Sequence, residues 1–103
     1  MGALGNSMAA FAQPLIDQTD GSIDQMQKAM SIAMLCWNMA ILPDGEHDEF
    51  LGNMKGEFQM DGEEFRTFRH DVIDPMIRRH RKMFPVMDPT RKQVLRSEGR
   101  AAN

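Results

Sequence analysis

The segment from Ser22 to Leu42 constrains the fold more than any other, because it reads as one helix that is apolar on almost every side. Ser22 followed by Gln25 forms a capping box, which favours a helix start. Apolar residues then recur at steps of three and four: Ile23, Met26, Met30, Ala33, Trp37 and Ala40. Beyond Ala29 the opposite face is apolar too. A helix of this kind must be surrounded, so the sequence predicts a buried central helix over residues 22–42.

This central segment does not resemble a membrane span. Its most apolar part, Ala29 to Leu42, holds 14 residues. As a helix these residues extend about 21 Å, whereas the hydrocarbon core of a bilayer is about 30 Å thick. The residues before Asp17 lack the basic and apolar regions of a secretory signal. Because Cys36 is the only cysteine and lies in an apolar run, we expect a buried thiol and a cytoplasmic protein without disulfides.

Helical periodicity also extends over most of the remaining chain. A first helix is predicted from Ala3 to Asp17, with Pro14 expected to kink it or end it near Gln13. A shorter helix is predicted over residues 46–58. A last helix begins at the cap residue Asp61 and carries apolar residues as far as position 83.

Pro75 lies inside the last helix and leaves two interpretations open. Proline cannot donate to the Asp71 carbonyl, so the helix kinks at this point. Alternatively, Asp74 caps a separate helix in which Pro75 is the first residue. Both interpretations keep the chain helical on either side of the proline.

The fold class that follows is all-α. Strand signals are nearly absent, since the chain has no tyrosine, three valines and three threonines. We predict a small bundle of about four helices around the buried central helix, with the last helix kinked or broken near Pro75. Residues 1–87 are expected to form one helical domain, and residues 88–103 a basic, flexible C-terminal tail.

Charge is distributed unevenly along the chain. Residues 1–65 hold two basic and eleven acidic residues, a net charge of −9, whereas residues 66–103 carry +6. The residues proposed to bind a partner are the basic ones of this second part: Arg78, Arg79, Arg81, Lys82, Arg91 and Lys92. Three interpretations remain: complement to the helix dipole with internal pairing, contact with a protein partner, or contact with nucleic-acid phosphates.

Signals for chemistry are weak. The three histidines, at positions 47, 70 and 80, are interpreted as surface residues. His70 and Asp74 are spaced for one helix face and form the only weak metal candidate, but a closed zinc site needs four ligands. No nucleophile motif, phosphate loop or cofactor signature is present. We therefore expect no catalytic residues and no cofactor.

The eleven methionines are the most unusual compositional feature. Methionine is flexible and polarizable, so it fills irregular cores and also suits adaptable binding surfaces. One interpretation is core packing. The other is an exposed, methionine-lined surface that a partner helix or a second copy of the chain covers.

Three functional classes remain from the sequence. The first is a non-catalytic helical interaction module, which includes self-association with a second copy or binding of another protein. The alternative is a nucleic-acid-associated regulator that uses the arginine-rich C-terminal part. A metal-binding or enzymatic protein is the third. The interaction module fits best, because the chain offers apolar helical surface and opposed charge but no catalytic set.

The buried central helix generates one prediction about stability. Trp37→Ala should lower the free energy of unfolding by about 3–5 kcal/mol, because truncating a buried tryptophan leaves a cavity. Chemical denaturation monitored by circular dichroism measures the loss. A nearly silent substitution would mean that Trp37 faces solvent or a partner.

Overall fold

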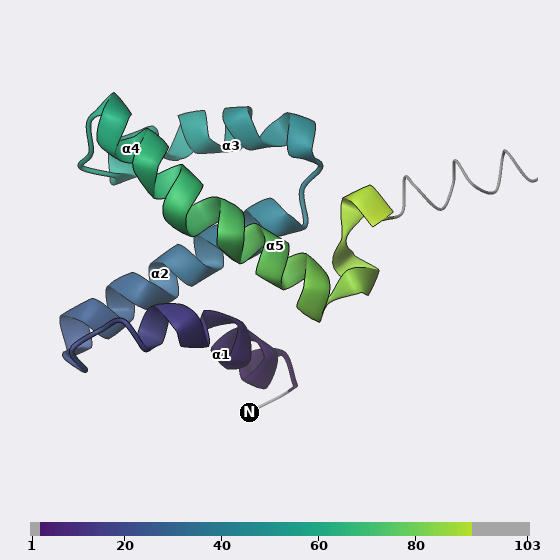
Figure 1. The fold of residues 1–103 in the computed structure, drawn as a ribbon, viewed down its shortest axis with the longest axis horizontal. Helices are drawn as coiled ribbons and strands as arrows, with labels where there is room; N and C mark the ends of the chain where they lie inside the picture. Colours follow the sequence, from purple (N-terminus) through teal and green to yellow (C-terminus); the bar gives the residue numbers. More distant parts are fainter. Residues whose placement is uncertain (1–2, 92–103) are drawn as a thin grey trace, which may run out of the picture.

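The regular structure of residues 3–91, the part that the computed structural model describes, is entirely helical (Figure 1). Its α-helices are α1 (Ala3–Ile16), α2 (Ile23–Ala40), α3 (His47–Met54), α4 (Gly62–Phe68) and α5 (Asp74–Met83). A π-helical turn joins α4 to α5, so these two run on as one helical segment and four segments result. No strand occurs among these residues, which confirms the all-α prediction. Nor does this part contain a helix that is long and apolar enough to cross a bilayer.

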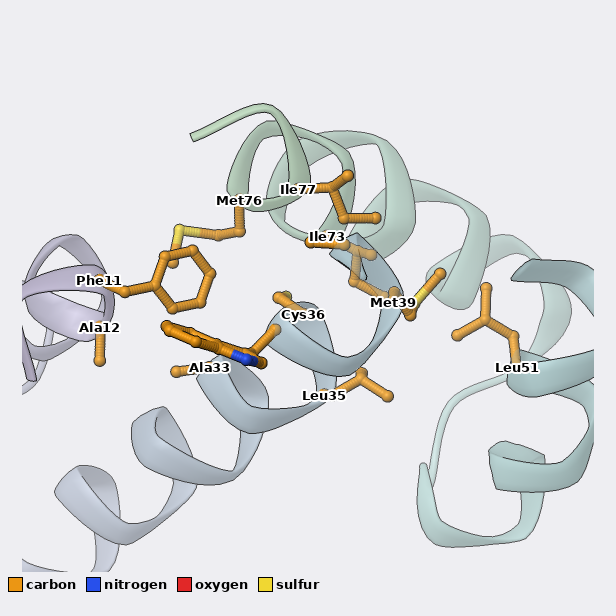
Figure 2. Packing of buried hydrophobic residues seen from close by; sticks show 12 residues of the cluster. Phe11, Ala12, Ala33, Leu35, Cys36, Met39, Leu51, Ile73, Met76 and Ile77 are labelled. Atoms are coloured by element: carbon orange, nitrogen blue, oxygen red, sulfur yellow. The ribbon is translucent and has the colours of Figure 1, made fainter. Parts of the chain in front are cut away.

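Helices α1 and α5 both pack on α2, and they also contact each other (Figure 1). Phe11 reaches from α1 toward Met76 of α5, while Met39 of α2 lies close to Ile73 of the π-helical turn (Figure 2). Leu51 adds the contribution of α3. The buried apolar residues of this cluster are Phe11, Ala12, Ala33, Leu35, Cys36, Trp37, Met39, Ala40, Leu51, Ile73, Met76 and Ile77. The expected burial of Trp37 and Cys36 is confirmed.

The last helical segment passes Pro75 without a break. Asp74 has helical backbone angles of φ −62° and ψ −45°, so it does not cap a new helix. Its N–H bonds to the carbonyl of Arg69, five residues earlier, within the π-helical turn Arg69–Ile73. Of the two interpretations of Pro75, the separate capped helix is therefore wrong. The wider π turn Arg69–Ile73 directly before Pro75 accommodates the missing donor of the proline.

Helix α1 continues through Pro14 to Ile16, close to the predicted span of Ala3–Asp17, so of the two expectations for Pro14 an end near Gln13 is wrong. Since Pro14 has no N–H, the carbonyl of Ala10 lacks its usual partner four residues on. The guanidinium of Arg79 supplies that partner: Nη2 lies 2.9 Å from the Ala10 carbonyl, and Nε lies 3.2 Å from the Phe11 carbonyl. A side chain of α5 thus replaces the backbone donor that α1 cannot provide.

Helix α2 begins as the sequence predicts, with one change in the capping bonds. The Ser22 hydroxyl accepts the N–H of Gln25 at 3.3 Å. The Gln25 side chain accepts in return from the N–H of Asp20 rather than that of Ser22, at 2.8 Å. The N–H of Ser22 donates to the Asp20 carboxylate, also at 2.8 Å. The capping box therefore reaches two residues further back into the loop than the simple motif.

The prediction that neighbours surround α2 on all sides is wrong. Every residue from Gly21 to Lys28 is exposed, and so are Met34 and Ile41. The buried residues of the helix begin only at Ala29. The sequence pattern counted apolar positions on both faces, but α1 and α5 are the main neighbours and cover only the face that carries Ala33 and Trp37. One apolar side of α2 remains open.

The bond between Arg79 and α1 predicts coupling to Pro14. Arg79→Met keeps the apolar stem and removes both donors, so the free energy of unfolding should fall by about 1 kcal/mol. In the Pro14→Ala background, the substituted residue supplies a backbone N–H for the Ala10 carbonyl, and Arg79→Met should cost clearly less. Urea denaturation of the four proteins of this double-mutant cycle gives the coupling. Equal losses in both backgrounds would show that Arg79 does not substitute for the missing donor.

Candidate interaction surface

The open side of α2 carries a line of apolar residues, which we call the α2 stripe: Ile23, Met26, Met30, Met34 and Ile41. Four of these side chains are exposed, Ile23 by 74%, Met26 by 40%, Met34 by 55% and Ile41 by 42%. At 3.6 residues per turn, all except Met26 fall within about 40° of one another around the helix axis. These four residues therefore share one face of the helix, which distinguishes the stripe from the single exposed apolar residues that any protein carries.

The residues beside the stripe are polar but uncharged. Gln27, Ser31 and Asn38 are all exposed and follow one edge of the stripe at helical spacing. A shallow hollow of about 530 Å³ lies over the N-terminal half, lined by Ile23, Met26, Gln27, Met30 and Ser31. An apolar floor with uncharged polar edges can accept an apolar helix face without burying an unpaired charge.

A second apolar region, between α2 and α4, has a different role. Two hollows of about 310 and 390 Å³ lie on either side of Phe68, and both are also lined by Lys28 and Ile32. Phe68 and Ile32 are partly buried and pack against the core. Their contacts are thus used by the fold itself. In contrast, Ile23, Met26, Met34 and Ile41 are not among the residues packed against the described core.

The basic residues of α5 divide into two groups. Arg79 and Arg81 are half-buried and bonded within the fold, whereas Arg78 and Lys82 are exposed. Arg91 is exposed as well, and Lys92 lies outside the described residues. Six basic positions were proposed for partner contact, and two of them have internal partners. The cationic surface that this part of the chain offers is correspondingly smaller than the sequence suggests.

Arg81 binds the C-terminal end of α2. Its guanidinium donates to the carbonyls of Ala40 at 3.3 Å and Leu42 at 3.4 Å, and it forms an ion pair with Asp44 at 2.7 Å. Nε lies 3.6 Å from the carboxylate of Asp88, which also accepts from Thr90. The internal pairing of the basic helix end with the acidic turn is confirmed at this residue. Asp88 and Thr90, which belong to the predicted tail, are held by these contacts, whereas most of that tail, residues 92–103, lies outside the described residues.

His47 is buried rather than at the surface, so the sequence interpretation of this residue is wrong. Its Nε2 lies 2.6 Å from the carbonyl of Met39 and 3.2 Å from that of Leu42. Helix α2 has no basic residue in its own last turn. Together with Arg81, His47 provides the donors that its terminal carbonyls need. The only sequence signal was position: His47 follows the Pro43–Gly45 stop by two residues, within reach of the helix end.

His80 is also buried, which corrects the second histidine interpretation. The ring is fully enclosed and makes edge-to-face contacts with Trp37, at a centroid distance of 4.2 Å, and with Phe11, at 5.3 Å. Phe84 lies 4.9 Å away. Neither ring nitrogen has a hydrogen-bond partner among the residues described. Burial lowers the pKa of His80 below 6.5, the Arg81 charge lowers it further, and the Asp88 charge acts in the opposite direction.

The weak metal candidate receives no further ligands from the fold. His70 is exposed, as expected, and its Nδ1 lies 2.9 Å from the carboxylate of the adjacent Asp71. Asp74 directly follows the π turn. Burial, together with the negative charge of Asp74, raises the pKa of the Cys36 thiol to about 12. In the part of the chain with assigned positions, no three histidine, cysteine or acidic side chains gather as a metal site would require.

Comparison with known proteins assigns the chain to no family. No protein-family model, curated protein or solved structure shows significant similarity to the chain. The functional argument therefore depends on the surface of the molecule itself.

The enclosed His80 predicts a pH dependence of stability. Because its pKa is lower in the folded chain than the ordinary 6.5, the unfolded chain takes up the proton first. The contribution of His80 is thus complete above pH 6.5 and is lost as the pH falls below that value. His80→Leu, which keeps the volume and removes the titration, should lose less stability between pH 7 and pH 5 than the wild type. Urea denaturation at a series of pH values measures both slopes, and identical slopes would contradict the assignment.

Proposed function

We propose that this chain is a non-catalytic helical interaction module and that the α2 stripe is its binding surface. The observation that carries the proposal is the exposure of four large apolar side chains along one face of a helix, with no charged residue along the described polar edge. A contiguous apolar surface of this kind is the usual mark of a site that another molecule covers.

The size of the stripe favours a weak, reversible contact with a partner. If the four exposed side chains are weighted by their exposed fractions, their removal from water contributes about 4 kcal/mol of favourable free energy to binding. Association itself costs about 4–15 kcal/mol, so the stripe alone does not hold a complex, and apolar surface buried on the partner must add to its contribution. The flexible thioethers of Met26 and Met34 favour a surface that adapts to its partner.

A nucleic-acid role has less support in the structure. The sequence argument for it depends on the clustered arginines, and the guanidinium groups of Arg79 and Arg81 are already bonded to carbonyls and carboxylates of the fold. Arg78, Lys82 and Arg91 remain at the surface. Phosphate contacts by these three would be weak and strongly salt-dependent.

The proposal can be tested by oxidising the methionines in place. Met26 and Met34 belong to the stripe, and Met87, which is 43% exposed and lies outside the stripe, is a matched internal control. Mild peroxide should convert all three to sulfoxides in dilute purified protein. In intact cells that express the chain, Met26 and Met34 should be protected severalfold relative to Met87, because a partner covers them.

Peptide mass spectrometry measures the three conversions in both samples. If Met26, Met34 and Met87 oxidise in the same ratio in cells and in dilute solution, the stripe is bare and the proposal is wrong. Protection of Met87 alone would place the interaction surface on the C-terminal part instead.

A further inference from the structure

We infer that the partner of the α2 stripe is a second copy of the same chain, paired with antiparallel α2 helices. This inference rests on the proposed function and adds the identity and direction of the partner. It follows from the order of side chains along the stripe. Ile23 and Ile41 each lie nine positions from residue 32, and Met30 and Met34 each lie two positions from it.

That spacing makes the stripe, apart from Met26, symmetric about its own centre. A rotation of 180° about an axis perpendicular to α2 at the level of residue 32 exchanges the positions of Ile23 and Ile41. The same rotation exchanges Met30 and Met34. In the antiparallel pair, Ile23 of one copy meets Ile41 of the other, and Met34 lies level with Met30, which is half-buried and also packs against its own core. Such two-fold, self-complementary contact is the commonest way in which identical chains associate. The paired length, from residue 23 to residue 41, is about 27 Å.

The charges at the two ends of α2 favour the antiparallel direction. Asp20 and Asp24 are exposed at the N-terminal end. The cationic last turn of α5 reaches the C-terminal end, where Arg81 bonds to the Ala40 carbonyl and the exposed Lys82 follows it. Antiparallel pairing keeps the Asp20 and Asp24 carboxylates of the two copies apart and places them near Lys82, while Asp44 at the same end already pairs with Arg81. Parallel pairing would gather all four carboxylates at one end, which is unfavourable.

The helix dipoles act in the same direction. Neighbouring antiparallel helices place the partial positive charge of one N-terminus beside the partial negative charge of the other C-terminus. The polar edge is compatible with this arrangement, because Gln27 and Asn38 carry no charge and can bond to each other's amides or to water. Met26 of one copy lies level with Asn38 of the other, so no charge is buried along the contact.

The test uses the full purified chain and opposite charges at the two ends of the stripe. The wild type should show a concentration-dependent monomer–dimer equilibrium in analytical ultracentrifugation up to about 1 mM, the range expected for a weak contact. Ile23→Glu and Ile41→Lys should each weaken dimerisation about tenfold or more. Glutamate is favourable at the N-terminal end of a helix and lysine at the C-terminal end, so the midpoint of thermal unfolding should not fall in either variant.

The double variant Ile23→Glu/Ile41→Lys decides the direction. In the antiparallel pair each glutamate meets a lysine of the other copy. The double variant should therefore dimerise more tightly than the sum of the two single changes in dimerisation free energy predicts. Asn53→Glu, which changes an exposed residue of α3 by the same charge as Ile23→Glu, should behave as the wild type. A double variant that associates more weakly than the two single effects predict would indicate parallel pairing and overturn the inference.

The oxidation experiment separates this inference from the proposed function. A purified chain that stays monomeric at about 1 mM, while Met26 and Met34 are protected in cells, would mean that another protein covers the stripe. The function would then stand and the second-copy inference would be wrong. If the methionines are unprotected in cells and the purified chain is monomeric, both the proposed function and the second-copy inference are wrong.

Discussion

The contact on which the rest of the structure depends is the aromatic cluster of Phe11, Trp37, His80 and Phe84. It joins three elements that are distant in the sequence: α1, α2 and the end of α5. A chain of 103 residues can bury only one core of moderate size. Because this cluster fixes where α1 and α5 lie on α2, it also determines which side of α2 is left without a cover. The exposed stripe is thus a consequence of the same packing that makes the core.

A second theme is the supply of donors to carbonyls that the backbone leaves unpaired. Pro14 leaves the Ala10 carbonyl free and Arg79 bonds to it, while Arg81 and His47 serve the end of α2. Unpaired backbone carbonyls in partly buried positions are costly, and long cationic side chains can reach them from another helix. Two of the ten basic residues in the part 66–103, Arg79 and Arg81, thus fasten α5 to its neighbours.

The sequence predicted the helices and their starts well, and the reasons are local. Ser22 and Asp61 cap their helices with side-chain oxygens, and periodic apolar residues placed Trp37 and Cys36 in the core. The errors concern contacts between distant residues. No local pattern says that Arg79 compensates for Pro14, or that His80 rather than a larger aromatic residue completes the cluster. The exposure of Met34 depends equally on where the other helices end.

The open side of α2 is hard to explain as a defect of the fold. Ile23 at the start of the helix and Ile41 at its C-cap are large β-branched residues where a polar side chain would suffice for the local structure. Polar substitution at such exposed positions costs little stability, since few contacts are lost. Isoleucine and methionine at these positions leave apolar surface in water, and in our proposal contact with another molecule offsets that cost. The covered face of α2 holds the molecule together, and its open face is the part that we propose for binding.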